Sequence, residues 1–191
     1  MIIKSLARVT YQEIFIALQK GEIIAYPTDT IYGLGADIFN QTAVEKLFEI
    51  KGRDASKTFS LLYFDLKKVR KDFDRLTDYE KQFIQLFLPG PVTLVLRTQY
   101  ENQFPNPFIK KGFAGIRVLH HFALNRLMAN FPNPITSTSI NPLTQIAQII
   151  DAGPMKNKRA STVLQVHRDN YTILRESAVS KQEIERKLQA L

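Results

Sequence analysis

The sequence predicts an α/β protein with a single hydrophobic core. Segments with helical periodicity alternate with segments typical of buried strands along the whole of its 191 residues, the pattern of a sheet flanked by helices. Hydrophobic residues make up 45% of the chain, which is enough to fill one core at this length. We find no internal repeat and no low-complexity block, so residues 1–191 are expected to fold as one domain.

The first helix and the first strand have clear boundary residues. Thr10 is a suitable N-cap for an amphipathic helix over residues 11–18, and Gly21 is a suitable end for it. Residues 22–26 follow as a buried strand, which stops at a proline. A loop rich in glycine and threonine is expected over residues 27–35.

The same criteria place the remaining elements. Apolar residues at helical spacing predict helices over residues 42–50, 78–88, 122–128 and 181–190, the last with Ser180 as its N-cap. Short apolar runs predict strands over residues 59–63, 92–96, 115–118, 135–138, 162–166 and 171–174, the last two as a pair around a turn at Asp169 and Asn170.

Composition narrows the possible partners and the compartment. The net charge of +8 favours anionic partners such as nucleotides or RNA, although a generally basic composition explains it equally well. Cysteine is absent, so we expect no disulfide and a cytoplasmic protein. No apolar run approaches the roughly 20 residues of a membrane helix, so we expect no membrane partner.

Several common catalytic signatures are missing. There is no Walker-type phosphate loop, and Gly33-Leu34-Gly35 lacks the third glycine of a dinucleotide fingerprint. The three histidines have no metal-ligand spacing, so we expect no metal bound by the protein alone. No cysteine and no serine in a nucleophile elbow is available, so a covalent intermediate is not expected.

Three polar segments remain as candidates for a site, and each also has a purely structural explanation. The segment 26–35 suits a loop that wraps a small polar ligand, or an ordinary turn. Lys51 and Arg53 follow a helix, where they suit either a phosphate clamp or a helix dipole. The run 137–141 follows an apolar strand, where an α/β sheet binds ligands or simply turns.

These segments together resemble the YrdC-like family of threonylcarbamoyl-adenylate synthases. The resemblance runs from about residue 10 to 180 and keeps its motifs in order. They are Tyr-Pro-Thr-Asp-Thr-Ile-Tyr-Gly-Leu-Gly at 26–35, Lys51-x-Arg53, Leu-Pro-Gly-Pro-Val-Thr at 88–93, Gly-Ile-Arg-Val at 115–118, Ser139-x-Asn141, Ser-Thr-Val at 161–163 and Ile-Leu-Arg at 173–175.

The resemblance implies an activity, its substrates and its partners. The family condenses L-threonine, bicarbonate and ATP, with Mg²⁺ entering on the nucleotide, and releases pyrophosphate. A partner transferase complex then passes the threonylcarbamoyl group to tRNA. The implied fold is a twisted mixed sheet flanked by helices with a concave basic surface, in the short form without an extra C-terminal domain.

The resemblance also implies roles for individual residues. The catalytic pair would be Lys51 and Arg53, which hold phosphates and stabilise the charge of the leaving pyrophosphate. The ATP contacts would be Lys51, Arg53, Ser139, Asn141 and Arg175. The threonine pocket would consist of Thr28, Thr30 and Tyr32, with Arg117 for the carboxylate and Ser161 and Thr162 at the rim.

A different class of function is the alternative, namely a paralogue that binds RNA without catalysis. Few aromatic residues are interleaved with the basic ones, as base stacking would require, which favours the synthase. The sequence also departs from the family pattern. Asn141 leads almost directly into residues 146–154, where family members have a further helix, and Asp54 and Thr58 stand where prolines are frequent.

Overall fold

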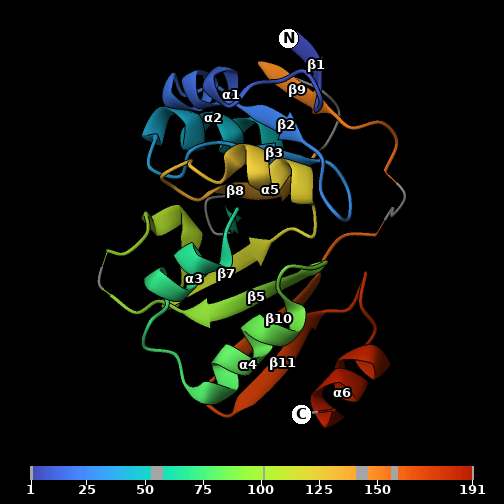
Figure 1. Ribbon diagram of the computed structural model, residues 1–191. Coiled ribbons are helices and arrows are strands. Elements are labelled where there is room, and N and C mark those ends of the chain that lie inside the picture. Colours follow the sequence, from blue (N-terminus) through green and yellow to red (C-terminus); the bar gives the residue numbers. More distant parts are fainter. Residues whose placement is uncertain (1, 53–57, 101, 141–145, 156–158, 191) are drawn as a thin grey trace.

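The computed structural model describes residues 2–52, 58–100, 102–140, 146–155 and 159–190 (Figure 1). Eleven strands form one sheet in the order β1-β9-β2-β3-β8-β4-β7-β5-β10-β11, with β6 paired to β7 outside this path. Parallel and antiparallel neighbours are mixed. The strands are β1 (Ile2–Ser5), β2 (Ile24–Tyr26), β3 (Gly33–Gly35), β4 (Ser60–Tyr63), β5 (Val92–Arg97), β6 (Ile109–Lys110), β7 (Phe113–Val118), β8 (Ile135–Ser139), β9 (Gln148–Asp151), β10 (Thr162–His167) and β11 (Asn170–Arg175).

Helices cover both faces of this sheet, and the alternation of side chains along the strands explains why. In β4, Leu61 and Tyr63 belong to one core cluster and Leu62 to the other. One cluster packs against α1 and α5, and the larger one packs against the other four α-helices. The helices are α1 (Tyr11–Gln19), α2 (Gln41–Lys51), α3 (Leu66–Asp72), α4 (Asp78–Phe87), α5 (Phe122–Met128) and α6 (Lys181–Gln189), with a 3₁₀ turn over Asn106–Phe108.

The predicted α/β class, with helices on a mixed sheet, is confirmed. Thr10 caps α1 and forms a reciprocal capping box with Glu13, whose carboxylate accepts the backbone N–H of Thr10 at 2.9 Å. Ser180 caps α6 by accepting the backbone N–H of Glu183 at 3.2 Å. Each predicted helix is present to within two residues at either end. No helix in the described ranges is long and apolar enough to cross a membrane.

The structure corrects the predicted loop over residues 27–35. Its last three residues, Gly33–Gly35, form strand β3, which pairs antiparallel with β2 and with β8. Two glycines in three residues concealed the strand, because glycine has no side chain to favour an extended conformation. The strands β1 and β9 and helix α3 were not predicted either. Helix α3 is only seven residues long and has one fully buried residue, Val69, so its apolar pattern is short and easily missed.

Candidate functional site

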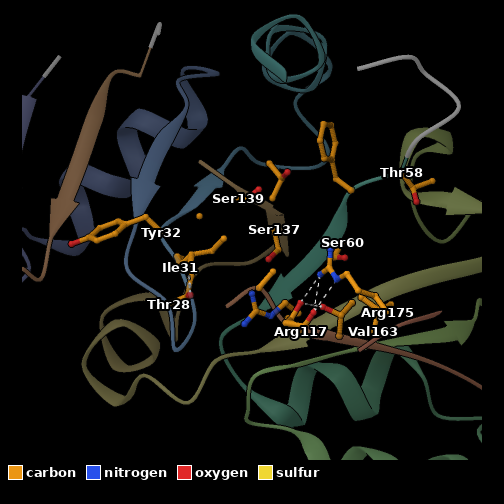
Figure 2. Close-up of a pocket in the computed structure, with 16 residues that line it drawn as sticks. Thr28, Ile31, Tyr32, Thr58, Ser60, Arg117, Ser137, Ser139, Val163 and Arg175 are labelled. Atoms are coloured by element: carbon orange, nitrogen blue, oxygen red, sulfur yellow. Dashed lines mark hydrogen bonds between the residues drawn. The ribbon is translucent and has the colours of Figure 1, made fainter. Parts of the chain in front are cut away.

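A cavity of about 180 Å³ lies across the middle strands of the sheet, beside the loop that follows β2 (Figure 2). We call it the central cavity. Half of its lining residues are serine or threonine, and two are arginine. The lining residues are Thr28, Ile31, Tyr32, Gly33, Thr58, Phe59, Ser60, Thr93, Arg117, Ser137, Thr138, Ser139, Ala160, Ser161, Val163 and Arg175.

The register of neighbouring strands produces one part of this polar wall. Gly33 of β3 pairs with Ser139 of β8, and Ser137 of the same strand pairs with Ser60 of β4. Residues two apart along a strand face the same side, so Ser137 and Ser139 stand in one row with Ser60. Hydroxyl side chains from two strands therefore face the cavity together.

The strands β5, β10 and β11 also supply residues to the cavity wall. Val163 of β10 pairs with Thr93 of β5 on one side and with Arg175 of β11 on the other. Gly115 belongs to β7, which lies between β4 and β5 in the sheet. A Cβ atom at Gly115 would come within 2.9 Å of the Ser60 hydroxyl and 3.4 Å of the Thr93 methyl group. The absence of a side chain at Gly115 therefore leaves room for the Ser60 and Thr93 side chains, which line the cavity.

The glycines of the 26–35 motif serve the fold more directly than they serve a ligand. A Cβ atom on Gly33 would come within 2.7 Å of the Tyr26 ring, and one on Gly35 within 2.7 Å of Ile135. The Tyr26 ring is fully buried, and its hydroxyl donates to the carbonyl oxygen of Thr136 at 3.0 Å. Burial raises the pKa of Tyr26 to about 12. Glycine is thus required in β3 because this aromatic ring packs across the strand.

The two threonines of the motif bond mainly to each other and to the backbone. The Thr28 hydroxyl donates to the carbonyl oxygen of Ile31 at 2.7 Å and accepts the backbone N–H of Thr30 at 2.9 Å. A hydroxyl has one hydrogen, so Thr30 is the donor in the 2.9 Å contact between the two hydroxyls. Thr28 lines the central cavity, whereas Thr30 is fully buried and does not. Thr30 therefore shapes the loop from behind the cavity wall.

Arg117 is the most deeply buried cation of the cavity. Its Nη2 donates to Oδ1 of Asp29 at 2.7 Å and lies 3.4 Å from the Thr30 hydroxyl. Its Nε is buried and has no hydrogen-bond partner among the described residues. Burial lowers the pKa of Arg117, while the nearby Asp29 carboxylate acts in the opposite direction. An arginine stays charged under such conditions, so the cavity wall holds a buried guanidinium with a free donor.

Tyr32 reaches the cavity but directs its hydroxyl elsewhere. In Figure 2 its ring points away from Arg117 and Ser137. The Tyr32 hydroxyl accepts the backbone N–H of Ala152 at 2.9 Å and lies 3.1 Å from the carbonyl oxygen of Gly153. The Tyr32 side chain therefore anchors the segment after β9, and the expected direct contact between its hydroxyl and a ligand has no support in this geometry.

Arg175 lines the cavity together with Ser161, on the side of strands β10 and β11. The Ser161 carbonyl oxygen accepts Nε of Arg175 at 3.1 Å and Nη2 at 2.8 Å. The Ser161 hydroxyl lies 2.8 Å from the Thr93 hydroxyl. These contacts fix an otherwise exposed arginine at the cavity, as the dashed lines of Figure 2 show.

Thr162 does not line the cavity, although the resemblance placed it at the rim. It is fully buried, and its hydroxyl donates to the carbonyl oxygen of Val179 at 2.7 Å. The Thr162 hydroxyl oxygen also accepts the backbone N–H groups of Ser177 and Val179 at 3.0 and 2.9 Å. Successive residues of a strand point to opposite faces, so Ser161 and Thr162 serve different sides of the sheet.

Lys51 reaches the cavity through the last residue of β8. It lies at the C-terminal end of α2, and its Nζ donates to the Ser139 carbonyl oxygen at 2.6 Å. Ser139 lines the cavity itself. The other two members of the expected phosphate site, Arg53 and Asn141, lie outside the described residues.

Ser60 and Thr93 are site candidates to which the resemblance assigned no role, although Thr93 ends the motif at 88–93. Each is a hydroxyl residue near the start of an otherwise apolar strand. Their common face becomes apparent only once β4, β7 and β5 are known to be adjacent. The assembled cavity can bind a small polar molecule that carries anionic groups, because cationic and hydroxyl donors predominate in its wall.

The chain resembles known proteins over most of its length. A family model named for Sua5, YciO and YrdC, and described as telomere recombination, matches residues 16–149. A threonylcarbamoyl-AMP synthase of Photobacterium profundum is 38% identical over 134 residues, which are 68% of this chain and 71% of that protein.

Solved structures agree with this relationship. The structure of P. abyssi Sua5 complexed with L-threonine matches with a TM-score of 0.81 and 25% identity over 98% of this chain. The match covers 59% of the P. abyssi chain, so the present chain corresponds to somewhat more than half of that protein. E. coli YciO, at 22% identity and a TM-score of 0.77, covers 93% of this chain and 94% of its own and shares the fold.

Proposed function

The chain belongs to the Sua5/YciO/YrdC family, and we propose that it is a threonylcarbamoyl-AMP synthase that works in the central cavity. The observation that carries this proposal is the pair of arginines that line a cavity rich in hydroxyl groups. A reaction between two anionic groups requires cationic and hydroxyl donors and no covalent nucleophile. Residues 1–191 would carry the activity as one domain.

L-threonine would bind at the Arg117 wall. The Arg117 guanidinium, which lines the cavity, would donate to an oxygen of the threonine carboxylate. Thr28 lines the same part of the cavity and holds the loop that shapes it. A structural neighbour, P. abyssi Sua5, binds L-threonine, which supports this choice of substrate.

ATP would extend from the Arg175 wall toward α2. Arg175 and Ser139 line the cavity, and Lys51 contacts the Ser139 carbonyl oxygen. By motif position, Arg53 and Asn141 would add the remaining phosphate and adenylate contacts. Mg²⁺ would arrive with the nucleotide, where phosphate and water oxygens supply most of its ligands. Ser161 contributes indirectly, by fixing Arg175.

The chemical step follows from these placements. The threonine amine forms a C–N bond with the carbon of bicarbonate, and the bicarbonate hydroxyl leaves as water with a proton from the amine; an oxygen of the resulting carbamate then attacks the α-phosphorus of ATP. The bond from the α-phosphorus to the bridging oxygen breaks, and pyrophosphate leaves with that electron pair. Lys51 and Arg53 would stabilise the charge that builds up on the leaving group. A threonylcarbamoyl-transferase complex would then use the adenylate to modify tRNA in the cytoplasm.

Nothing in the described residues favours the alternative of a protein that binds RNA without catalysis. A cavity of about 180 Å³ suits a small molecule, and its two arginines are tied to Asp29 and to Ser161 rather than presented on a flat surface.

The decisive experiment measures pyrophosphate release from ATP and bicarbonate, with L-threonine, with L-serine and without an amino acid. The proposal predicts release that depends on threonine and is much weaker with serine. Absence of threonine-dependent release from the folded protein, with a known synthase as positive control, would exclude the synthase and favour a binding role.

A further inference from the structure

Asp29 does not line the central cavity, yet it contacts the buried arginine that does. One carboxylate oxygen, Oδ1, accepts Nη2 of Arg117 at 2.7 Å, and Oδ2 accepts the backbone N–H of His120 at 2.8 Å. Each oxygen thus has a donor from β7 or from the residues just after it. The Asp29 carboxylate is therefore held in one orientation with respect to β7.

This ion pair is nearly inaccessible to water, since the side chains of Arg117 and Asp29 are 7% and 9% exposed. Burying two opposite charges adds little net stability, because the loss of hydration offsets their attraction. A buried pair is explained better by the orientation that it imposes on its members. Here the member that faces the cavity is Arg117.

The contact with Asp29 limits how the guanidinium of Arg117 can turn. Nη2 is committed to Asp29 and lies near Thr30, and the guanidinium is planar. Fixing Nη2 therefore restrains the whole guanidinium, of which the Nε–H bond is a part. This Nε–H is buried and has no partner in the part of the chain that the structure describes. Because this atom is sealed from the cavity, a ligand there meets another part of the Arg117 guanidinium.

We propose that Asp29 is the positioning residue of the amino-acid subsite, because it holds the Arg117 guanidinium in the orientation in which it meets the substrate carboxylate. Asp29 touches no substrate in this proposal and acts through Arg117 alone. The inference rests on the proposed function for the identity of the amino acid. Bicarbonate offers similar oxygen atoms, so the test must separate the two.

The test is the kinetics of Asp29→Asn against Asp37→Asn. In Asp29→Asn, the new amide can accept the His120 N–H through its oxygen but then presents its NH₂ group to Arg117. Asp37 is a matched control, because its carboxylate also accepts a backbone N–H, that of Phe39, and lies outside the cavity lining. We expect Asp29→Asn to raise the KM for L-threonine roughly 10- to 100-fold and to leave the KM values for ATP and bicarbonate within about threefold.

A comparison of ligands shows whether the effect passes through the carboxylate. By calorimetry, Asp29→Asn should weaken the binding of L-threonine and leave the weaker binding of L-threoninamide, which lacks the carboxylate charge, unchanged. An unchanged KM for threonine, or an equal rise for all three substrates, would overturn the proposal. A rise confined to bicarbonate would overturn the assignment to the amino acid.

A measurement on the unmodified protein covers the case in which Asp29→Asn does not fold, and it does not depend on catalysis. The Nε–H resonance of Arg117, assigned by its loss in Arg117→Lys, should be sharp without ligand and should shift with L-threonine but not with L-threoninamide. A resonance broadened by exchange without ligand would contradict the fixed orientation. A sharp resonance with no threonine response would contradict the proposed substrate and leave the Asp29–Arg117 geometry intact.

Discussion

The hydroxyl of Tyr32 lies 3.1 Å from the carbonyl oxygen of Gly153, a residue 121 positions further along the chain. The same oxygen of Tyr32 accepts the backbone N–H of Ala152 at 2.9 Å and lies 3.3 Å from Oδ1 of Asp151. One side chain thus joins the loop before β3 to the segment after β9. That segment leads on toward Ala160 and Ser161, which line the central cavity.

The Tyr32→Phe variant should separate this anchoring role from direct ligand binding. Removing the hydroxyl should lower the free energy of unfolding by about 1 kcal/mol, because the Ala152 N–H loses its acceptor. The KM for L-threonine should rise by less than about tenfold, since the hydroxyl contacts the protein and not the substrate. Chemical denaturation and steady-state kinetics measure the two effects. A loss of threonine affinity with unchanged stability would instead place the hydroxyl on the substrate.

The Thr162→Val variant should affect stability alone. Valine has nearly the shape of threonine but leaves one carbonyl oxygen and two backbone N–H groups near residues 177–179 without their partner. We expect a loss of roughly 1 to 3 kcal/mol in unfolding free energy. Kinetic constants measured well below the new melting temperature should match those of the unmodified protein. A raised KM for any substrate would return Thr162 to the site.

Much of the fold could be predicted from local signals. Helices α1 and α6 have caps and apolar faces that are visible in the sequence, and both were predicted to within one residue. The strand β3 has no such signal, because its glycines are required by the Tyr26 ring that packs across it. That requirement is tertiary, so it could be recognised only after β2 and β3 were seen to pair.

The candidate site, like the fold, was predicted only in part from the sequence. The resemblance placed Arg117, Arg175 and Ser161 in one site, and the structure brings all three to the central cavity. The resemblance gave no reason to choose Asp29, because an aspartate in a loop between threonines is typical of an ordinary turn. Its role depends on β7, whose Arg117 lies 88 residues further along the chain and is brought beside the loop by the sheet.

Replacing Arg175 should distinguish the proposed ATP-binding region of the cavity from the proposed threonine-binding region. Arg175 donates through both Nε and Nη2 to the Ser161 carbonyl oxygen, a geometry that lysine cannot reproduce. We expect Arg175→Lys to raise the KM for ATP roughly tenfold and to leave the KM for L-threonine nearly unchanged. Arg97→Lys is the control, because Arg97 is an exposed residue at the end of β5 outside the cavity lining. A larger effect on threonine than on ATP would reverse the proposed placement of the two substrates.

Alkaline pH should destabilise the protein through Tyr26. Burial raises the pKa of Tyr26 in the folded state from 10.0 to about 12, so the folded state holds its proton more tightly than the unfolded state does. The resulting stability is fully present below pH 10 and is lost as the pH rises from 10 through about 12. The loss should be on the order of 2 kcal/mol across this interval.

The Tyr26→Phe variant lacks both the titrating group and the hydrogen bond to Thr136. The variant should therefore be less stable than the unmodified protein at pH 8 and should lose less unfolding free energy between pH 10 and 12. Denaturant midpoints of both proteins, measured in parallel across this range, test the prediction, because the other titrating groups are common to both. Equal losses in the two proteins would mean that Tyr26 does not titrate with the fold.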